Sequence, residues 1–168
     1  WESPHTVLQV VNDDMPFLVD SVTMKLAEMG IGVHVLGHPV VPMQRDKAGK
    51  LLAVGEGTTE SFMHLEIDRQ SQVGMKRIEL ELRAVLDDVR AIVRDWPAMR
   101  AKMLEVADEL GKRDMPTVSK AGRSEAQEFL RWAADNHFTF LGYREYEVAR
   151  TEGDEVLQAV EKSGQGIL

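Results

Sequence analysis

Residues 10–22, "VVNDDMPFLVDSV", contain the change from strand to helix that decides the fold of this chain. The stretch "HTVLQVV" at residues 5–11 is short and rich in β-branched residues, which predicts a buried strand. Asp13 and Asp14 can then accept hydrogen bonds from the free amides of a helix start. Pro16 is tolerated in a first helical turn because it has no amide hydrogen. We therefore predict a strand, a polar turn and a helix, in this order.

The first helix is predicted over residues 16–29. Gly30 is expected to end it, because glycine adopts a left-handed backbone at no steric cost. Apolar residues recur at helical spacing within this helix and predict one buried stripe, formed by Leu18, Val19, Val22, Leu26 and Met29.

A set of strands follows this helix. Residues 31–46 predict a second strand, and Pro39 and Pro42 remove ladder donors, so we expect its distal half to be an edge or a bulge. The turn "DKAGK" at residues 46–50 predicts a hairpin, in which "LLAV" at residues 51–54 returns along the sheet.

In the segment "SFMHLEID" at residues 61–68, apolar residues at 63, 65 and 67 alternate with mostly polar residues at 62, 64, 66 and 68. We expect Met63, Leu65 and Ile67 to face the helices. This segment is our choice for the fourth strand of the sheet, with residues 138–148 as the rival.

A second apolar stripe of helical period begins near residue 75 and covers about 50 Å at 1.5 Å per residue, more than one small sheet can bury. Pro97 lies inside the stripe and should break the helix, and Asp95 can cap a second helix that begins after this break. We therefore expect two helices joined nearly in line, the second projecting as an arm. The stripe is formed by Ile78, Leu82, Val85, Val89, Ile92, Trp96, Met99, Met103, Val106 and Leu110.

The remainder of the chain predicts a linker at residues 113–123, then a helix and a hairpin. Ser124 and Gln127 have the spacing of a capping box and are expected to open the helix. Residues 137–150 are strand-like, and "VLQAV" at residues 156–160 could pair back. The residues of the helix that we expect to face inward are Phe129, Leu130 and Ala133.

These elements predict an α+β fold, in which an antiparallel sheet is covered on one face by two helices. A helical arm extends the first domain, which we place at residues 1–112. Residues 113–123 would be the linker, and the helix and hairpin of residues 124–168 would begin a further domain.

The composition excludes several classes of function. The 168 residues include 28 acidic and 20 basic side chains, a formal charge of −8 that repels nucleic acid and anionic membranes. The absence of cysteine excludes disulfides and Cys-based zinc sites and is compatible with a reducing cytoplasm. No apolar run approaches the ~20 residues of a membrane span. Because the chain opens at Trp1 and stops at "SGQGIL", we expect a segment of a longer protein.

The acidic pair at Asp13 and Asp14 has two interpretations. A catalytic pair needs a cleft, a shifted proton affinity and a third orienting group, and the sequence offers none of them. We therefore interpret both residues as helix-start acceptors, worth roughly 0.5–2 kcal/mol. Binding of a ligand amine by Asp14 is the alternative.

Other polar residues give weaker signals. His34, His38 and His64 could in principle hold zinc, but the first two are roughly 13 Å apart along an extended strand, which favours half-buried sheet histidines. Ser21 and Ser61 have no histidine and acid partners that the spacing would unite, so a serine hydrolase is not indicated.

The Gly-x-Gly of "VGEGTTES" at residues 54–61 lacks a third glycine and precedes a strand, so it predicts a loop and no nucleotide site. A last group of large apolar residues is as consistent with an assembly surface as with an internal core. This group consists of Trp96, Met99, Met103 and Trp132.

The order of elements resembles the ACT domain, a ferredoxin-like regulatory module. ACT domains typically carry a D-x-P-G loop before the first helix and a glycine before the second strand, which correspond here to Asp14, Pro16 and Gly30. Phe17 stands where the usual loop glycine would be. A phenyl ring at that position would obstruct a ligand that approaches the helix backbone.

Beyond these motifs, the amino-acid sequence is similar to the N-terminal part of the large bacterial NAD-dependent glutamate dehydrogenases. Four separated blocks carry this resemblance in the same order. They are "VNDDMPFLVDSV" (11–22), "GHPVVPMQRDKAGKL" (37–51), "ESFMHLEID" (60–68) and "FLRWAADNHFTFLGYREYEV" (129–148).

This resemblance implies a multidomain enzyme that deaminates L-glutamate to 2-oxoglutarate and ammonia and passes hydride to NAD. In that family the catalytic core lies far downstream, so we expect here a non-catalytic regulatory or architectural segment with neither cofactor nor metal. The expected partners are other domains and subunits of the parent enzyme, in a cytoplasmic homo-oligomer.

Two alternatives from other functional classes remain open. The first is an autonomous amino-acid sensor, and the second, less favoured, is a metal-dependent hydrolase that uses the three sheet histidines. The residues that would bind the amino-acid effector are Asp13, Asp14, Met15, Pro16 and Gly30.

Overall fold

The computed structural model describes residues 3–113, 115–151 and 154–168. It divides into two compact units, residues 1–89 and 90–168, and the long helix α2 (Gln72–Lys112) contributes to both. The domain boundaries expected from the sequence, at residues 112 and 123, stay a prediction.

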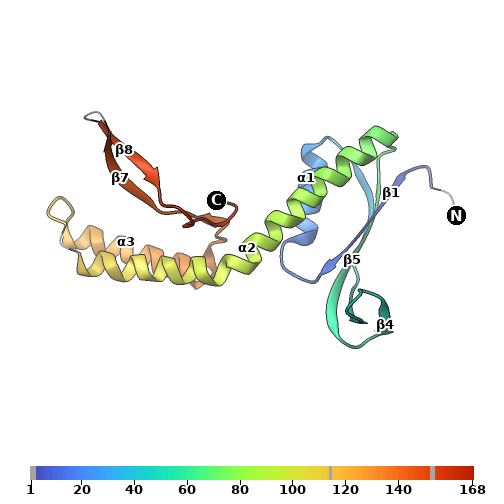
Figure 1. The fold of residues 1–168 in the computed structure, drawn as a ribbon, viewed down its shortest axis with the longest axis horizontal. Helices are drawn as coiled ribbons and strands as arrows, with labels where there is room; N and C mark the ends of the chain where they lie inside the picture. Colours follow the sequence, from blue (N-terminus) through green and yellow to red (C-terminus); the bar gives the residue numbers. More distant parts are fainter. Residues whose placement is uncertain (1–2, 114, 152–153) are drawn as a thin grey trace. The chain divides into compact units, whose positions relative to one another are not determined.

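The first unit is an antiparallel five-stranded sheet with helices on one face (Figure 1). Strand β5 is central: β1 pairs along one side of it, β2 and β3 pair along the other, and β4 pairs with β3. The predicted α+β arrangement is therefore confirmed. The elements of this unit besides α2 are β1 (Thr6–Asp13), α1 (Leu18–Glu28), β2 (Val33–Gly37), β3 (Val40–Arg45), β4 (Leu51–Val54) and β5 (Thr58–Ile67).

The core lies between the helix-facing side of β5 and the two helices. Met63, Leu65 and Ile67 are at most 2% exposed, which confirms the predicted alternation. Each such side chain stabilises the folded state by roughly 1.5–3 kcal/mol relative to an exposed position. The helices complete this core with Leu18, Val22 and Leu26 of α1 and with Ile78, Leu82, Leu86 and Val89 of α2.

The segment that we chose as a sheet strand, residues 61–68, lies within β5, at the centre of the sheet. The rival segment, residues 138–148, contributes β6 and the start of β7, which among the described strands pair with β9 and β8 and not with this sheet. The choice of residues 61–68 is therefore confirmed.

The predicted second strand, residues 31–46, is two strands separated at His38 and Pro39. The expected bulge is present in the distal half, between Gln44 and Arg45, where the register to β4 shifts. The prediction of an edge or a bulge is therefore confirmed by the bulge, and β3 itself is not an edge, because it pairs with β5 on one side and β4 on the other. Pro42 lies before the bulge, opposite Thr59 of β5.

The predicted turns at residues 46–50 and at Gly30 are both confirmed. Asp46 donates its amide to the Lys50 carbonyl at 3.0 Å, which closes the hairpin. Gly30 has a left-handed φ of 72°, and the Ile31 amide donates to the Leu26 carbonyl at 2.9 Å. This bond satisfies a carbonyl that the end of α1 leaves free.

Helix α2 continues through Pro97, so the prediction of two helices is wrong. A proline removes one helical hydrogen bond, and the packed turns on both sides keep the helix intact despite that loss. Asp95 does not cap a restart. Its carboxylate accepts hydrogen bonds from Arg94 at 2.8 Å and from the Gly166 amide at 2.9 Å.

The second unit contains the C-terminal half of α2 and a helix beside it, α3 (Figure 1). Gln127 donates to the Ala107 carbonyl at 2.8 Å, and Arg131 pairs with Asp108 at 2.8 Å, so α3 lies along α2. The elements after α2 are α3 (Lys120–Trp132), the π-helical turn η1 (Ala133–His137), β6 (Gly142–Tyr143), β7 (Tyr146–Thr151), β8 (Asp154–Ala159) and β9 (Gln165–Gly166).

Helix α3 begins five residues earlier than the capping box predicted, so that prediction is wrong. Ser119 is the N-cap, and its side chain accepts a hydrogen bond from the Gly122 amide at 3.0 Å. Ser124 lies within the helix and donates instead to Glu128. Either serine satisfies the sequence rule for a cap, and only the path of the chain before the helix decides between them.

The inward face predicted for this helix is wrong at one position. Phe129 is 55% exposed, while Ala133 is buried. The predicted hairpin is confirmed, because β7 and β8 pair in continuous register from Tyr146 opposite Ala159.

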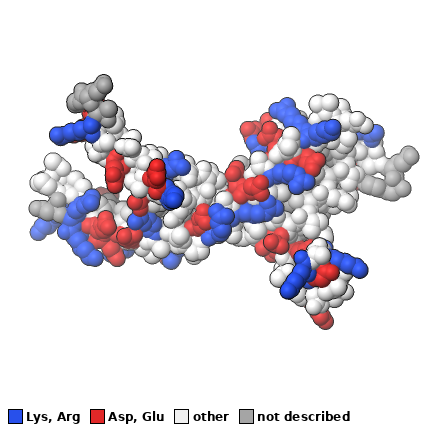
Figure 2. Space-filling model, viewed as in Figure 1, with Lys and Arg blue, Asp and Glu red and all other residues white. Residues whose placement is uncertain are grey.

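Charges of both signs alternate over the face shown in Figure 2. In the part of the chain that the structure describes, no helix is long and apolar enough to cross a membrane.

Candidate functional site

The turn between β1 and α1 contains most of the residues that the sequence singles out. Strand β1 ends at Asp13, which lies opposite Glu60 of β5. The Asp14 amide donates to the Thr59 carbonyl at 3.0 Å, and this bond extends the ladder by one step. Pro16 and Phe17 then form a turn, so both carboxylates lie at the exposed end of the strand.

The two carboxylates do not cap helix α1, and this prediction is wrong. The N-cap residue is Phe17, which has no side-chain acceptor. Among the described residues, no hydrogen bond joins the carboxylate of Asp13 or Asp14 to an amide of α1. A side-chain cap has to stand directly before the helix, and the turn separates Asp14 from that position.

Phe17 has a left-handed backbone, with φ of 71° and ψ of 0°. This conformation is one that glycine adopts freely, whereas a side chain makes it unfavourable by roughly 1–2 kcal/mol. The turn itself therefore explains why a glycine is usual at this position in ACT domains. Phe17 is 44% exposed, so its side chain adds little to the core.

The structure brings only part of the predicted ligand-binding set together. Asp13, Asp14, Met15 and Pro16 are contiguous at the N-terminal end of α1, whereas Gly30 follows its C-terminal end. An 11-residue helix separates them by roughly 16 Å. These residues therefore do not surround one small molecule within this chain.

Three buried polar side chains lie beside this turn, on the two faces of the sheet, and sequence reasoning missed them. Asn12, Glu60 and Ser61 are 7%, 6% and 0% exposed. Asn12 and Ser61 are directly opposite each other on β1 and β5. The alternation of side chains along β5 could have revealed the burial of Ser61, because Ser61 lies on the same face of the strand as Met63 and Leu65.

Ser61 has a histidine partner that the sequence spacing did not reveal. His38 Nε2 and Ser61 Oγ are 2.6 Å apart. A nucleophilic serine needs access to substrate and a third group that orients the histidine. Ser61 is fully buried, and among the described residues no carboxylate is hydrogen-bonded to His38. The hydrogen bond therefore holds the connection between β2 and β3 close to β5.

Glu60 forms a bidentate ion pair with Arg45. The guanidinium Nε and a terminal nitrogen donate to the two carboxylate oxygens at 2.5 and 2.7 Å. These hydrogen bonds hold the pKa of Glu60 below its usual value and raise the pKa of Arg45. The pair connects β3 to β5 on the rung where Asp13 also lies opposite Glu60.

The other sheet histidines form contacts of their own. His34 pairs with Asp68 at 2.8 Å and stacks on His5 with ring centroids 4.2 Å apart. His64 lies 3.5 Å from the Gln9 side chain. Over the described ranges, no group of three or more side chains is arranged to hold a metal ion.

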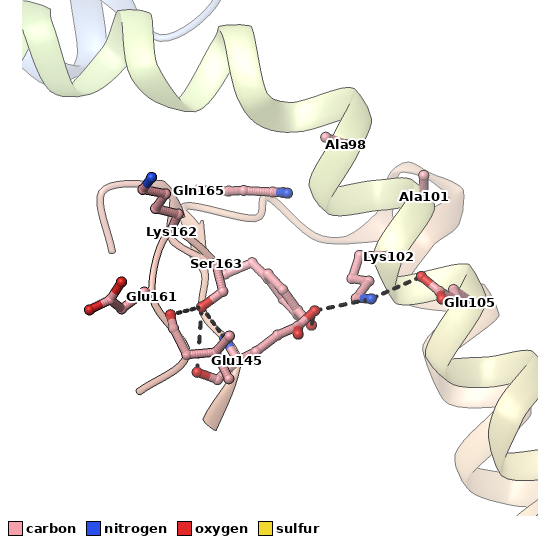
Figure 3. Close-up of a pocket in the computed structure, with 11 residues that line it drawn as sticks. Ala98, Ala101, Lys102, Glu105, Glu145, Glu161, Lys162, Ser163 and Gln165 are labelled. Carbon is pink, nitrogen blue, oxygen red and sulfur yellow. Dashed lines mark hydrogen bonds and ion pairs between the residues drawn. The ribbon is translucent and has the colours of Figure 1, made fainter. Parts of the chain in front are cut away.

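A pocket of about 520 Å³ lies in the second unit (Figure 3). Lys102 bridges Glu105 and Glu145 at 3.0 Å each, and Tyr143 donates its hydroxyl to Glu145 at 2.9 Å. Lys102 is the main cause that lowers the pKa of Glu145, while burial raises the pKa of Tyr143. These contacts leave Lys102, Tyr143 and Glu145 each paired with a neighbour. They attach the β-structured end of this unit to α2.

Replacing Phe17 tests the left-handed turn. We expect the Phe17→Gly variant to be more stable than Phe17→Ala by about 1 kcal/mol, because both lose the ring and only glycine is free of strain at φ of 71°. The free energy of unfolding in urea measures the difference.

At Met24, an exposed position inside α1, the same pair of substitutions serves as a control. The order should reverse there, because glycine is about 1 kcal/mol worse than alanine in a helix interior. Equal stability of the two Phe17 variants would contradict the strain argument.

The Glu60 pair predicts a pH-dependent stability. The pKa of Glu60 is lower in the folded chain than its ordinary value of 4.5, so its contribution is complete above that pH and is lost as the pH falls through the folded-state pKa. We expect the stability difference between the wild type and Glu60→Gln to shrink on acidification.

Urea unfolding at several pH values measures this difference. Glu79→Gln is the control, because Glu79 forms an exposed pair with Arg83 within one helix and such pairs contribute little at any pH. A difference for Glu60→Gln that stays constant down to strongly acidic pH contradicts the assignment.

The comparisons with known proteins agree with this geometry. Residues 1–82 match the family model described as "Glutamate dehydrogenase, ACT1 domain". Three curated relatives carry the name NAD-specific glutamate dehydrogenase. The protein of Halomonas elongata is 38% identical over 99% of this chain, that of Pseudomonas aeruginosa 39% over 89%, and that of Mycobacterium tuberculosis 32% over 96%.

The chain spans only about a tenth of the length of these relatives, 11% of the first and 10% of the others. The matched residues 1–82 contain the whole five-stranded sheet, helix α1 and the first turns of α2. The resemblance to the large NAD-dependent glutamate dehydrogenases is thereby confirmed, and residues 1–82 belong to the glutamate dehydrogenase ACT1 domain family.

Proposed function

We propose that this chain is a non-catalytic, regulatory and architectural segment of an NAD-dependent glutamate dehydrogenase. The parent reaction would convert L-glutamate, NAD and water to 2-oxoglutarate, ammonia and NADH at a site outside this chain. The observation that supports the proposal most directly is the extent of the match. Relatives of that name align with up to 99% of the chain, yet the chain amounts to about 11% of their length.

The geometry of the first unit supports the same proposal. Two of its buried polar groups have partners: Ser61 contacts His38, and Glu60 contacts Arg45. Ser61 and Glu60 are 0% and 6% exposed, so neither is accessible to a substrate as a nucleophile, acid or base. The exposed carboxylates of Asp13 and Asp14 stand at a strand end with no orienting group among the described residues.

The partners in this proposal are other domains and subunits of the parent enzyme. Large apolar side chains on the surface favour such contacts, since a chain that is one part of a larger assembly buries them against its neighbours. Val54 of β4, Leu80 of α2 and Leu157 of β8 are 62%, 71% and 72% exposed. A cytoplasmic location, suggested by the absence of cysteine, belongs to the same proposal.

The proposal predicts no dehydrogenase activity in the isolated chain. We expect the purified 168-residue chain to form no NADH from L-glutamate and NAD, because the proposed reaction site lies in the part of the parent enzyme outside this chain. The absorbance of NADH measures the reaction, and the parent enzyme at equal molar concentration is the positive control. Glutamate oxidation by the segment alone would overturn the proposal.

A second candidate function is the sensing of an amino acid at the β1–α1 turn. The observation in its favour is that Asp13 and Asp14 present two exposed carboxylates beside a helix start, where a ligand amine could pair with them. Phe17 and the distance to Gly30 argue against a complete site within one copy of the chain. We therefore rank this function second.

Calorimetry with each of the common amino acids tests the sensor. Saturable binding that is lost in Asp14→Ala and retained in Asp20→Ala supports it, because Asp20 lies in the first turn of α1 without belonging to the loop. The absence of a binding isotherm for every amino acid would exclude it and leave the architectural role.

A further inference from the structure

The outer edge of β1 is the most conspicuous unsatisfied feature of the first unit. Strand β1 is the terminal strand of the sheet and pairs only with β5 among the described strands (Figure 1). Its pairing with β5 is regular over all eight residues, from Thr6 opposite Ile67 to Asp13 opposite Glu60. Its other side therefore presents a long, straight row of backbone donors and acceptors.

The other edges of this sheet are protected in ways that β1 is not. Strand β2 has five residues and a register shift between Val33 and Val35, and β4 has four residues beside the shift at Gln44 and Arg45. Short strands and bulges prevent edge pairing, as do lysine, arginine and proline. The sequence of β1, "TVLQVVND", contains none of those three residue types. An edge of this kind is expected to be covered.

One hydrogen bond determines which residues of β1 bond outward. The Asp14 amide donates to the Thr59 carbonyl, in register with the ladder, so even-numbered residues bond to β5. In an antiparallel pair the bonding direction alternates with each residue. The amides and carbonyls of Val7, Gln9 and Val11 therefore point outward.

The side chains of β1 show the same lack of a neighbour. Leu8 and Val10 lie opposite Leu65 and Met63, on the face that the helices cover. Leu65 and Met63 are 0% and 2% exposed, whereas Leu8 and Val10 are only half-buried. On the opposite face, Val11 is 54% exposed. A strand beside β1 would cover apolar surface on both faces.

We propose that this edge pairs with β1 of a second copy of the chain, antiparallel, about a two-fold axis at Gln9. Antiparallel self-pairing is the arrangement that a two-fold dimer imposes, because each copy then uses the same surface. In this register Val7 lies opposite Val11 of the other copy and Leu8 lies opposite Val10. Apolar residues then meet apolar residues on both faces, and the two sheets join into one.

The matching of polar and apolar side chains favours this register over the one with its axis at Val10. With the axis at Val10, Asn12 would oppose Leu8 and Asp13 would oppose Val7, so polar groups would meet apolar ones. The self-complementary apolar pattern of β1 therefore favours a second copy as the partner, with the axis at Gln9.

This interface deepens the proposed architectural function but does not rest on it, since its argument uses only the edge of β1. Failure of the test below would leave the dehydrogenase assignment unaffected. Activity in the isolated chain would likewise leave the interface unaffected.

Single cysteines test the register directly, because the natural chain contains none. In Gln9→Cys, the two introduced residues face each other across the axis, about 5.5 Å apart between Cα atoms, which a disulfide can bridge. In Val11→Cys, which lies on the same edge and face, the two residues would be roughly 13 Å apart. We expect Gln9→Cys to form covalent dimers at least about tenfold faster, because the interface holds its thiols at high effective concentration.

A mixture of Val7→Cys and Val11→Cys should cross-link more than either variant alone, since these positions oppose each other. Light scattering on the wild-type chain should give the mass of a dimer that decreases on dilution, and circular dichroism checks that each variant is folded. Equal cross-linking of Gln9→Cys and Val11→Cys would overturn the proposal. A wild-type chain that stays monomeric at the highest concentration tested would also overturn it and would assign this edge to another segment of the parent protein.

Discussion

The first unit depends on the burial of one face of β5. This strand pairs on both sides and lies beneath both helices, so Met63, Leu65 and Ile67 lose almost all contact with water. The other elements are placed relative to this strand: β1, β2 and β3 by backbone hydrogen bonds, β4 through its pairing with β3, and α1 and α2 by packing on the apolar face of β5. Because a slip of one residue would turn each of these side chains to the other face, the register of the whole sheet follows from this strand.

The same alternation buries the hydroxyl of Ser61 near the N-terminal end of β5. Ser61 continues the buried phase, and a hydroxyl in that position must be hydrogen-bonded to avoid the cost of an unpaired buried group. His38 provides that partner because the chain breaks between β2 and β3 at this rung. The histidine and the serine are thus explained by the requirements of the sheet. This is the physical basis for assigning a scaffold role to residues that, seen as a list, resemble part of a catalytic triad.

The elements with strong local signals could be predicted from the sequence. The alternation of β5, the stop of α1 at Gly30 and the hairpin turn at residues 46–50 each depend on side chains within a few residues of one another. The errors lie at positions where a local rule applies but the structure does not follow it, namely Pro97, Ser124 and Phe129. Helix α2 continues through Pro97, and Ser119 caps the helix for which Ser124 also qualified.

The candidate site shows the same division. The sequence by itself determined that a polar turn connects a strand to a helix, that one face of β5 is buried, and that the chain resembles a glutamate dehydrogenase ACT module, because these depend on residue order and spacing. Only the tertiary structure decided that Asp13 and Asp14 do not cap α1, that Ser61 meets His38, and that the edge of β1 is open. Each of these depends on how strands far apart in the sequence align across β5, and local preferences contain no information about that alignment.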